Sequence, residues 1–171
     1  MTPLSALYPW IVFVHVTGAF AFVLAHGVAV FTGFRVRQEH DRARIAALLD
    51  LSTASISLMY GALLVAVVAG LLAAGIGGWL GRLWPWTSIG VLIVVAAAMA
   101  LIGSGHFRRL RQLVGASISR SQARRLPPPP DPETAEQELG LRLRSRRPEL
   151  LAGIGSGGLL IVIWLMVLKP F

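Results

Sequence analysis

The stretch YPWIVFVHVTGAFAFVLAHGVAVFTGF, residues 8–34, decides the fold. It contains no Asp, Glu, Lys or Arg, and it carries two of the four histidines of the chain. At about 1.5 Å per residue, a helix of this length crosses a hydrocarbon core about 30 Å thick with some tilt. The run far exceeds the apolar core of a signal peptide, so we expect a retained membrane-spanning helix.

The two histidines of this helix, His15 and His26, are predicted to share one face. They lie eleven residues apart, which is three helical turns plus about 20°, and about 16 Å apart along the axis. Small residues such as Gly18 and Gly33 fall on the same face. The opposite face carries Phe13, Thr17, Phe20, Leu24, Val28 and Phe31. We therefore expect the histidine face to pack against protein and the bulky face to meet lipid.

Three further apolar runs follow, at residues 51–76, 86–105 and 149–168. Trp79, Trp84 and Trp86 crowd the short connection before the third run, as is typical of the headgroup level of a membrane. The fold class is therefore all-α: a polytopic membrane protein with four transmembrane helices in an up-down bundle. We expect residues 1–171 to form a single membrane domain, with charged loops at 35–50 and 106–148.

The second charged loop has internal structure of its own. We expect the third helix to continue beyond residue 105 along it, and the four prolines at 127–130 to stop any helix in favour of an extended segment. Asp131, Pro132 and Glu133 then form a helix-start signal. Glu138 and Arg142 stand at the favourable i,i+4 spacing, which predicts a short surface helix to about residue 147. Pro148 is expected to open the fourth membrane helix.

The distribution of basic residues predicts the orientation. Segments 35–50 and 106–149 contain fourteen of the sixteen basic residues, leaving only Arg82 and Lys169 elsewhere. The positive-inside rule then places both loops in the cytoplasm and both termini outside, N-out and C-out. All eight acids lie in the same two segments, so their net charge is +6. Anionic lipid is the expected partner of this surface, and the groove-reading or base-stacking elements of a nucleic-acid-binding protein are not recognisable.

His15 and His26 are the candidate cofactor-binding residues. The ordinary interpretation is that each imidazole fills a small-residue interface and bonds a backbone carbonyl or a hydroxyl; the functional one is that it binds haem or a metal. Bis-histidine haem ligation needs imidazoles at matching depth on two helices, and neither His106 nor His40 matches, so no such pair is predicted.

Methionine could supply a second ligand to haem b or copper. Met59 and Met99 are expected near the depth of His26, and Met166 near that of His15. Methionines are more commonly gap-fillers of a bundle, so the ligand set of any metal is left unassigned.

The sequence lacks the residue patterns of several other common kinds of functional site. The chain has no cysteine, which excludes disulfides and thiolate sites. The glycines of the fourth helix lack the Lys-Ser or Lys-Thr of a phosphate-binding loop. Their 153/157 spacing instead predicts close helix packing at Gly153 and Gly157, within this chain or with another. Within the membrane runs the one acid is Glu149, at an edge, so no catalytic carboxylate pair is expected.

The first helix, YPWIVFVHVTGAF, and the second, LSTASISLMYGALLVAVVAGLL, resemble small bacterial four-helix membrane proteins. These are the copper-resistance-D-like and HemJ-like proteins and their uncharacterised relatives. The resemblance extends from the first helix to the end of the second and implies that His15 would be a haem ligand. Phe20 and Phe22 stand where tryptophan is expected, and the uncharacterised relatives are the most similar.

The sequence thus favours a non-enzymatic integral protein of the bacterial cytoplasmic (inner) membrane, an accessory subunit of unknown biochemical role. It would act as a homo-oligomer or within a larger membrane complex. The alternative is a redox or transport protein that binds haem b or copper through His15, assisted by His26 or a methionine.

Overall fold

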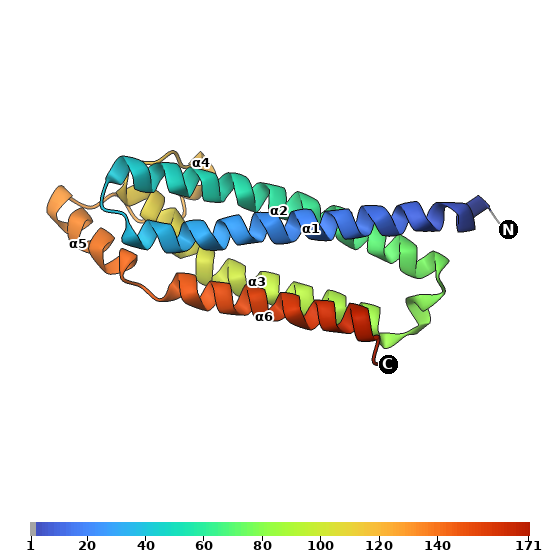
Figure 1. Ribbon diagram of the computed structural model, residues 1–171. Coiled ribbons are helices and arrows are strands. Elements are labelled where there is room, and N and C mark those ends of the chain that lie inside the picture. Colours follow the sequence, from blue (N-terminus) through green and yellow to red (C-terminus); the bar gives the residue numbers. More distant parts are fainter. Residues whose placement is uncertain (1–2) are drawn as a thin grey trace.

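A computed structural model of the protein describes the backbone of residues 3–171 and the side chains from residue 6 onward. Four long helices run up and down (Figure 1), and each of them is long and apolar enough to cross a membrane. They are α1 (Pro3–Gln38), α2 (Arg42–Ile76), α3 (Leu83–Leu113) and α6 (Arg147–Leu168). The predicted all-α, up-down arrangement of four apolar helices is confirmed, and the chain is a multi-pass membrane protein in contact with the lipid bilayer.

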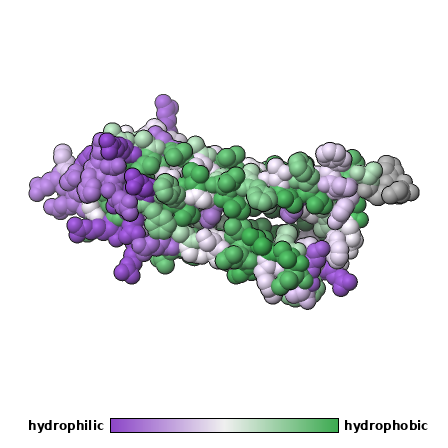
Figure 2. All heavy atoms as spheres, viewed as in Figure 1, coloured by the Kyte–Doolittle hydropathy of each residue, from purple (hydrophilic) through white to green (hydrophobic). Residues whose placement is uncertain are grey.

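The two ends of the bundle differ. One end gathers segments 35–50 and 106–149, together with the short helices α4 (Arg120–Ala123) and α5 (Pro132–Leu143), and we refer to it as the polar end. The opposite end carries both termini and the connection from α2 to α3, which includes the 3₁₀ turn η1 (Trp79–Gly81); we refer to it as the hairpin end. Figure 2 shows hydrophilic residues concentrated at the polar end and hydrophobic residues over the length of the helices.

The helices extend further into the charged segments than the apolar runs do. Residues 35–50 were expected to form a loop, but α1 continues to Gln38 and α2 begins at Arg42. The Asp41 carboxylate accepts a hydrogen bond from the Ala43 amide at 2.8 Å and so caps α2. Arg- and Ala-rich sequence favours helix regardless of hydropathy, and the turn between α1 and α2 is therefore short.

The structure of the second charged segment largely follows the prediction. The third helix extends past residue 105 to Leu113, and residues 127–130 are not helical. Asp131 caps α5 by accepting from the Thr134 amide at 3.0 Å, and Arg142 Nε donates to Glu138 at 2.8 Å, one helical turn away. However, α5 ends at Leu143 instead of near residue 147, and Pro148 lies in the first turn of α6.

The four long helices associate as two pairs. α1 packs along α2 and α3 packs along α6, while the two pairs meet each other less extensively. Figure 2 shows a narrow opening between the pairs toward the hairpin end. The bulky face of α1 is exposed as predicted, and its members Phe13, Phe20, Leu24 and Phe31 are among the most accessible apolar side chains of the helix. Exposed apolar side chains on a membrane-spanning helix are the surface that meets lipid.

The continuous hydrophobic core lies at the polar end. It consists of Val36, Ile45, Leu49, Leu110, Leu113 and Leu139, contributed by the ends of α1, α2 and α3 and by α5. In water, full burial of an aliphatic side chain stabilises the folded state by about 1.5–3 kcal/mol. The apolar driving force for folding is thus concentrated where the helices extend beyond the apolar runs.

Candidate functional site

His15 lies in the interface between α1 and α2. Its Nδ1 donates a hydrogen bond to the carbonyl of Ala66 at 2.7 Å; because a carbonyl only accepts, the proton is on Nδ1. The ring rests on Gly70, where an added Cβ would be 2.8 Å from Nδ1. One turn along α1, a Cβ on Gly18 would be 3.0 Å from the Ala66 nitrogen. Small residues thus let the two helices approach closely, and the imidazole fills part of that interface.

His26 lies in a different interface, where α1 meets α3 and α6. Its side chain is 6% exposed and stacks on Phe22, with ring centroids 6.0 Å apart. A Cβ added to Gly155 of α6 would be 2.7 Å from His26 Nε2 and 3.4 Å from Met99 Sδ. The imidazole nitrogen and the thioether sulfur therefore flank the same point. Among the described residues, His26 Nε2 has no hydrogen-bond partner, an unusual condition for a buried nitrogen.

The two histidines face different neighbours despite sharing one face of α1. His15 contacts α2 and His26 contacts α3 and α6, so the structure does not bring the two imidazoles together on one partner helix. Met99 does lie beside His26, at the depth the sequence predicts. In the part of the chain that the structure describes, no three His, Cys, Asp or Glu residues cluster in a way suited to a metal ion.

The glycines that α6 uses for packing are not the predicted ones. A Cβ on Gly153 or Gly157 would meet nothing within 4 Å, so these two glycines do not form the packing face of α6 within this chain, and their packing against another chain stays a prediction. The buried glycines are Gly155, against His26, and Gly158, where a Cβ would be 2.4 Å from a Val95 methyl group. Both pairs have helical spacing, and only the docking of α6 on α1 and α3 decides between them.

An ion pair between a buried arginine and a partly exposed glutamate joins α3 to α5 at the polar end. Arg109 is 8% exposed and donates from Nε and Nη2 to the Glu138 carboxylate at 3.0 and 2.6 Å. Its Nη1 donates to Gln112 at 2.7 Å and to the carbonyl of Pro127 at 3.3 Å, which fixes the proline segment. The Arg109 guanidinium, and then that of Arg142, lower the pKa of Glu138 to about 2. The carboxylate therefore remains ionised at neutral pH. Helical spacing predicts only the contact with Arg142, because Arg109 is too distant in the sequence.

Three more ion pairs tie the elements of the polar end together. Arg37 of α1 contacts Glu149 of α6 at 2.5 Å, and Arg111 of α3 contacts Asp50 of α2 at 2.5 Å. The third joins Arg42 of α2 to Glu136 of α5. Exposed pairs contribute little singly, about 0–1 kcal/mol. Their role here is to select which elements adjoin.

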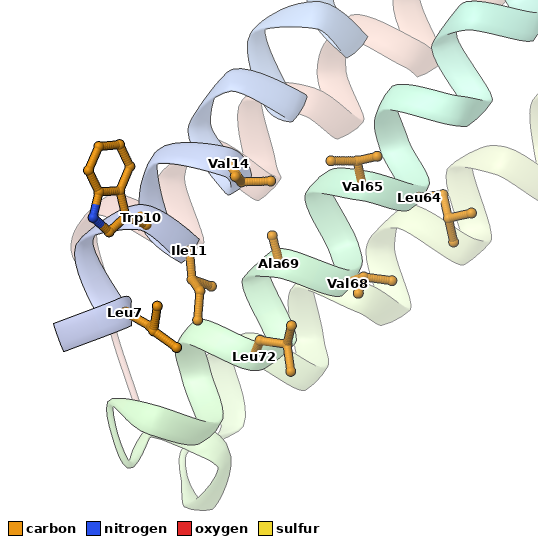
Figure 3. A pocket seen from close by; sticks show the side chains of 9 residues that line it. All are labelled: Leu7, Trp10, Ile11, Val14, Leu64, Val65, Val68, Ala69 and Leu72. Carbon is orange, nitrogen blue, oxygen red and sulfur yellow. The ribbon is translucent and has the colours of Figure 1, made fainter. Parts of the chain in front are cut away.

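Two hollows have no histidine in their lining. The first, of about 430 Å³, is an apolar groove between α1 and α2 near the hairpin end; Figure 3 shows its nine lining side chains. They are Leu7, Trp10, Ile11, Val14, Leu64, Val65, Val68, Ala69 and Leu72. The second, of about 490 Å³, is formed by Arg120, Ser121, Arg124 and Arg125 on and after α4. The first suits hydrocarbon and the second suits an anion.

Comparison with known proteins identifies no family. No family model matches the chain, and neither do any curated protein or solved structure. The structure supports one part of what the resemblance to small bacterial membrane proteins implies, namely four helices that are each long and apolar enough to span a membrane.

Proposed function

We propose that the protein is a non-enzymatic accessory subunit of the bacterial cytoplasmic membrane, with its polar end in the cytoplasm and both termini outside. The observation that carries this proposal is the distribution of charge. Fourteen of sixteen basic residues occur in two segments, and those segments adjoin at one end of the bundle. A positive excess on one side of the membrane is the usual determinant of orientation.

A pair of reporter fusions tests the orientation. A reporter that is active only in the cytoplasm should be active when fused after Leu126, in the polar end, and inactive when fused after Phe171, at the hairpin end. The two fusions are compared at equal protein level in the membrane fraction. If the Phe171 fusion is active and the Leu126 fusion is inactive, the proposed orientation is the wrong way round.

The same charge distribution supports contact of the polar end with anionic lipid. The two segments have a net charge of +6, and anionic headgroups attract basic segments close to a membrane surface. As an accessory subunit the chain would associate with a second copy or with other membrane proteins through its lipid-exposed helix faces.

One observation favours a second candidate function, the binding of haem b or copper by the histidines. His26 Nε2 is buried without a partner among the described residues and lies beside Met99, and imidazole with thioether is a sound ligand pair for either. At His15, donation from Nδ1 to Ala66 leaves Nε2 as the ligand atom, the arrangement that second-shell bonding gives to metal-bound histidine. The close contact of the His26 ring with Gly155 suits a small ion better than a porphyrin.

The absorption spectrum and metal content of the purified protein separate the two candidates. Colourless, metal-free protein is expected for the accessory subunit. A Soret band that His15→Ala removes would establish the haem alternative. A third outcome is that copper is bound, is retained in His15→Ala, and is lost in both His26→Ala and Met99→Leu. It would place a metal beside His26, where α1 meets α3 and α6.

A further inference from the structure

The hollow formed by Arg120, Ser121, Arg124 and Arg125 brings three arginines of the polar end together. Arg37, Arg42, Arg44, Arg109, Arg111 and Arg142 are all paired with carboxylates. Among the residues with described side chains, none of the three arginines of the hollow pairs with an acid. Three guanidinium groups thus line one small space without an internal counter-charge.

Seven of the eight acids of the chain have partners elsewhere among the described residues. Five of them, Asp41, Asp50, Glu136, Glu138 and Glu149, form the ion pairs. Glu39 accepts amide hydrogens in the turn between α1 and α2, Asp131 accepts one at the start of α5, and the eighth acid, Glu133, lies in the first turn of α5. The three arginines are exposed to solvent, and like charges at short range repel one another. The hollow is therefore suited to an anion from outside the chain.

The level of the hollow along the bundle axis indicates where that anion comes from. Arg111 donates to the carbonyl of Ser117 at 2.7 Å, to Asp50 at 2.5 Å and to Thr53 at 3.0 Å. Ser117, just before α4, is thus held level with the start of the apolar run of α2, where Leu51 and Leu58 are exposed. This level is the boundary between charged and lipid-facing surface.

We propose that Arg120, Arg124 and Arg125, with the Ser121 hydroxyl, bind the phosphate of an anionic phospholipid headgroup. The inference rests on the proposed contact of the polar end with anionic lipid and assigns that contact to one site. Guanidinium groups donate in a planar fork that matches phosphate oxygens. The headgroup phosphate of a lipid in the adjacent leaflet lies at the level of the hollow, while its acyl chains follow the apolar surface of α2.

The test compares two triple variants of the full chain in neutral detergent. One replaces Arg120, Arg124 and Arg125 with Gln. The control replaces Arg35, Arg144 and Arg146 with Gln, which removes the same charge from the same end at arginines that also lack a carboxylate partner among the described residues. Native mass spectrometry measures the affinity of each for phosphatidylglycerol and for phosphatidylcholine. Thermal unfolding without lipid checks folding, and single Arg124→Gln and Arg125→Gln variants replace the triple if it fails to fold.

The wild type should prefer phosphatidylglycerol, and the α4 triple variant should lose at least about tenfold of that affinity, because it removes the charge-assisted hydrogen bonds from guanidinium to phosphate that the control variant keeps. The control should lose less than about threefold. Equal losses in both variants would refute the α4 site while leaving general lipid contact intact. No preference for phosphatidylglycerol in any protein would refute both. Displacement of the lipid by inorganic phosphate at equal concentration would show that a free anion, not a lipid, occupies the hollow.

Discussion

His26→Arg should prevent the protein from accumulating as a folded, monodisperse species, whereas Leu24→Arg should be tolerated. His26 is 6% exposed, its ring stacks on Phe22, and it lies against Gly155. Leu24, close by on α1, is 69% exposed. An arginine at Leu24 can extend along the helix to the interface or draw water to itself. One at position 26 has neither room nor a nearby acid, since Glu149 already pairs with Arg37.

The experiment compares expression level and size-exclusion profile of the two variants side by side. His26→Gln serves as a control, because it removes the imidazole without adding charge and should be much milder. His15→Arg should also be worse than Leu24→Arg, because the His15 ring is packed on Gly70. If Leu24→Arg is the most damaging of the set, then the histidine face of α1 meets lipid, and the case for either histidine as a buried ligand fails with it.

Hydropathy and periodicity predicted the parts of the fold that local sequence determines. A long apolar run without any charged residue has few alternatives to a membrane helix, and the faces of α1 follow from the helical repeat of about 100° per residue. Asp131 caps α5 as expected because the capping bond joins near neighbours in the sequence. The ends of the long helices were harder to predict from hydropathy. Hydropathy marks the lipid-embedded length, whereas α1 and α2 continue as helices stabilised by the core around Ile45 and Leu49.

The candidate sites depended on tertiary contacts that spacing does not encode. The neighbours of His15 and His26 follow from how α2, α3 and α6 dock on α1, and the spacing of the two histidines carries no information about them. Likewise, Arg109 and its partner Glu138 lie on different helices, beyond the reach of helical spacing. The sequence predicts that the segment near residue 120 is part of the basic surface. The position of Ser117, just before this segment, depends on Arg111, which bridges Ser117 to Asp50 of α2.

Gly158→Leu should strongly destabilise the protein, whereas Gly157→Leu, at the adjacent position, should have little effect. A Cβ at position 158 would lie 2.4 Å from Val95 Cγ2, closer than real Cβ contacts allow, so α6 and α3 would have to separate. Overpacking of this kind costs about 1–3 kcal/mol, and in a membrane interface the loss of close backbone approach adds to it. A Cβ at position 157 meets nothing within 4 Å.

The measurement is thermal unfolding in detergent, with loss of monodispersity as a second readout. Gly158→Ala gives a smaller version of the same clash, and Val95→Ala removes the two methyl groups that cause most of it. The double variant Gly158→Ala/Val95→Ala should therefore be more stable than the sum of the single effects predicts, because the new methyl group occupies the vacated space. Simple additivity, or equal damage from Gly157→Leu and Gly158→Leu, would mean that α6 does not dock on α3 through Gly158. The position of Gly155 against His26, one turn earlier on the same face, would then also be wrong.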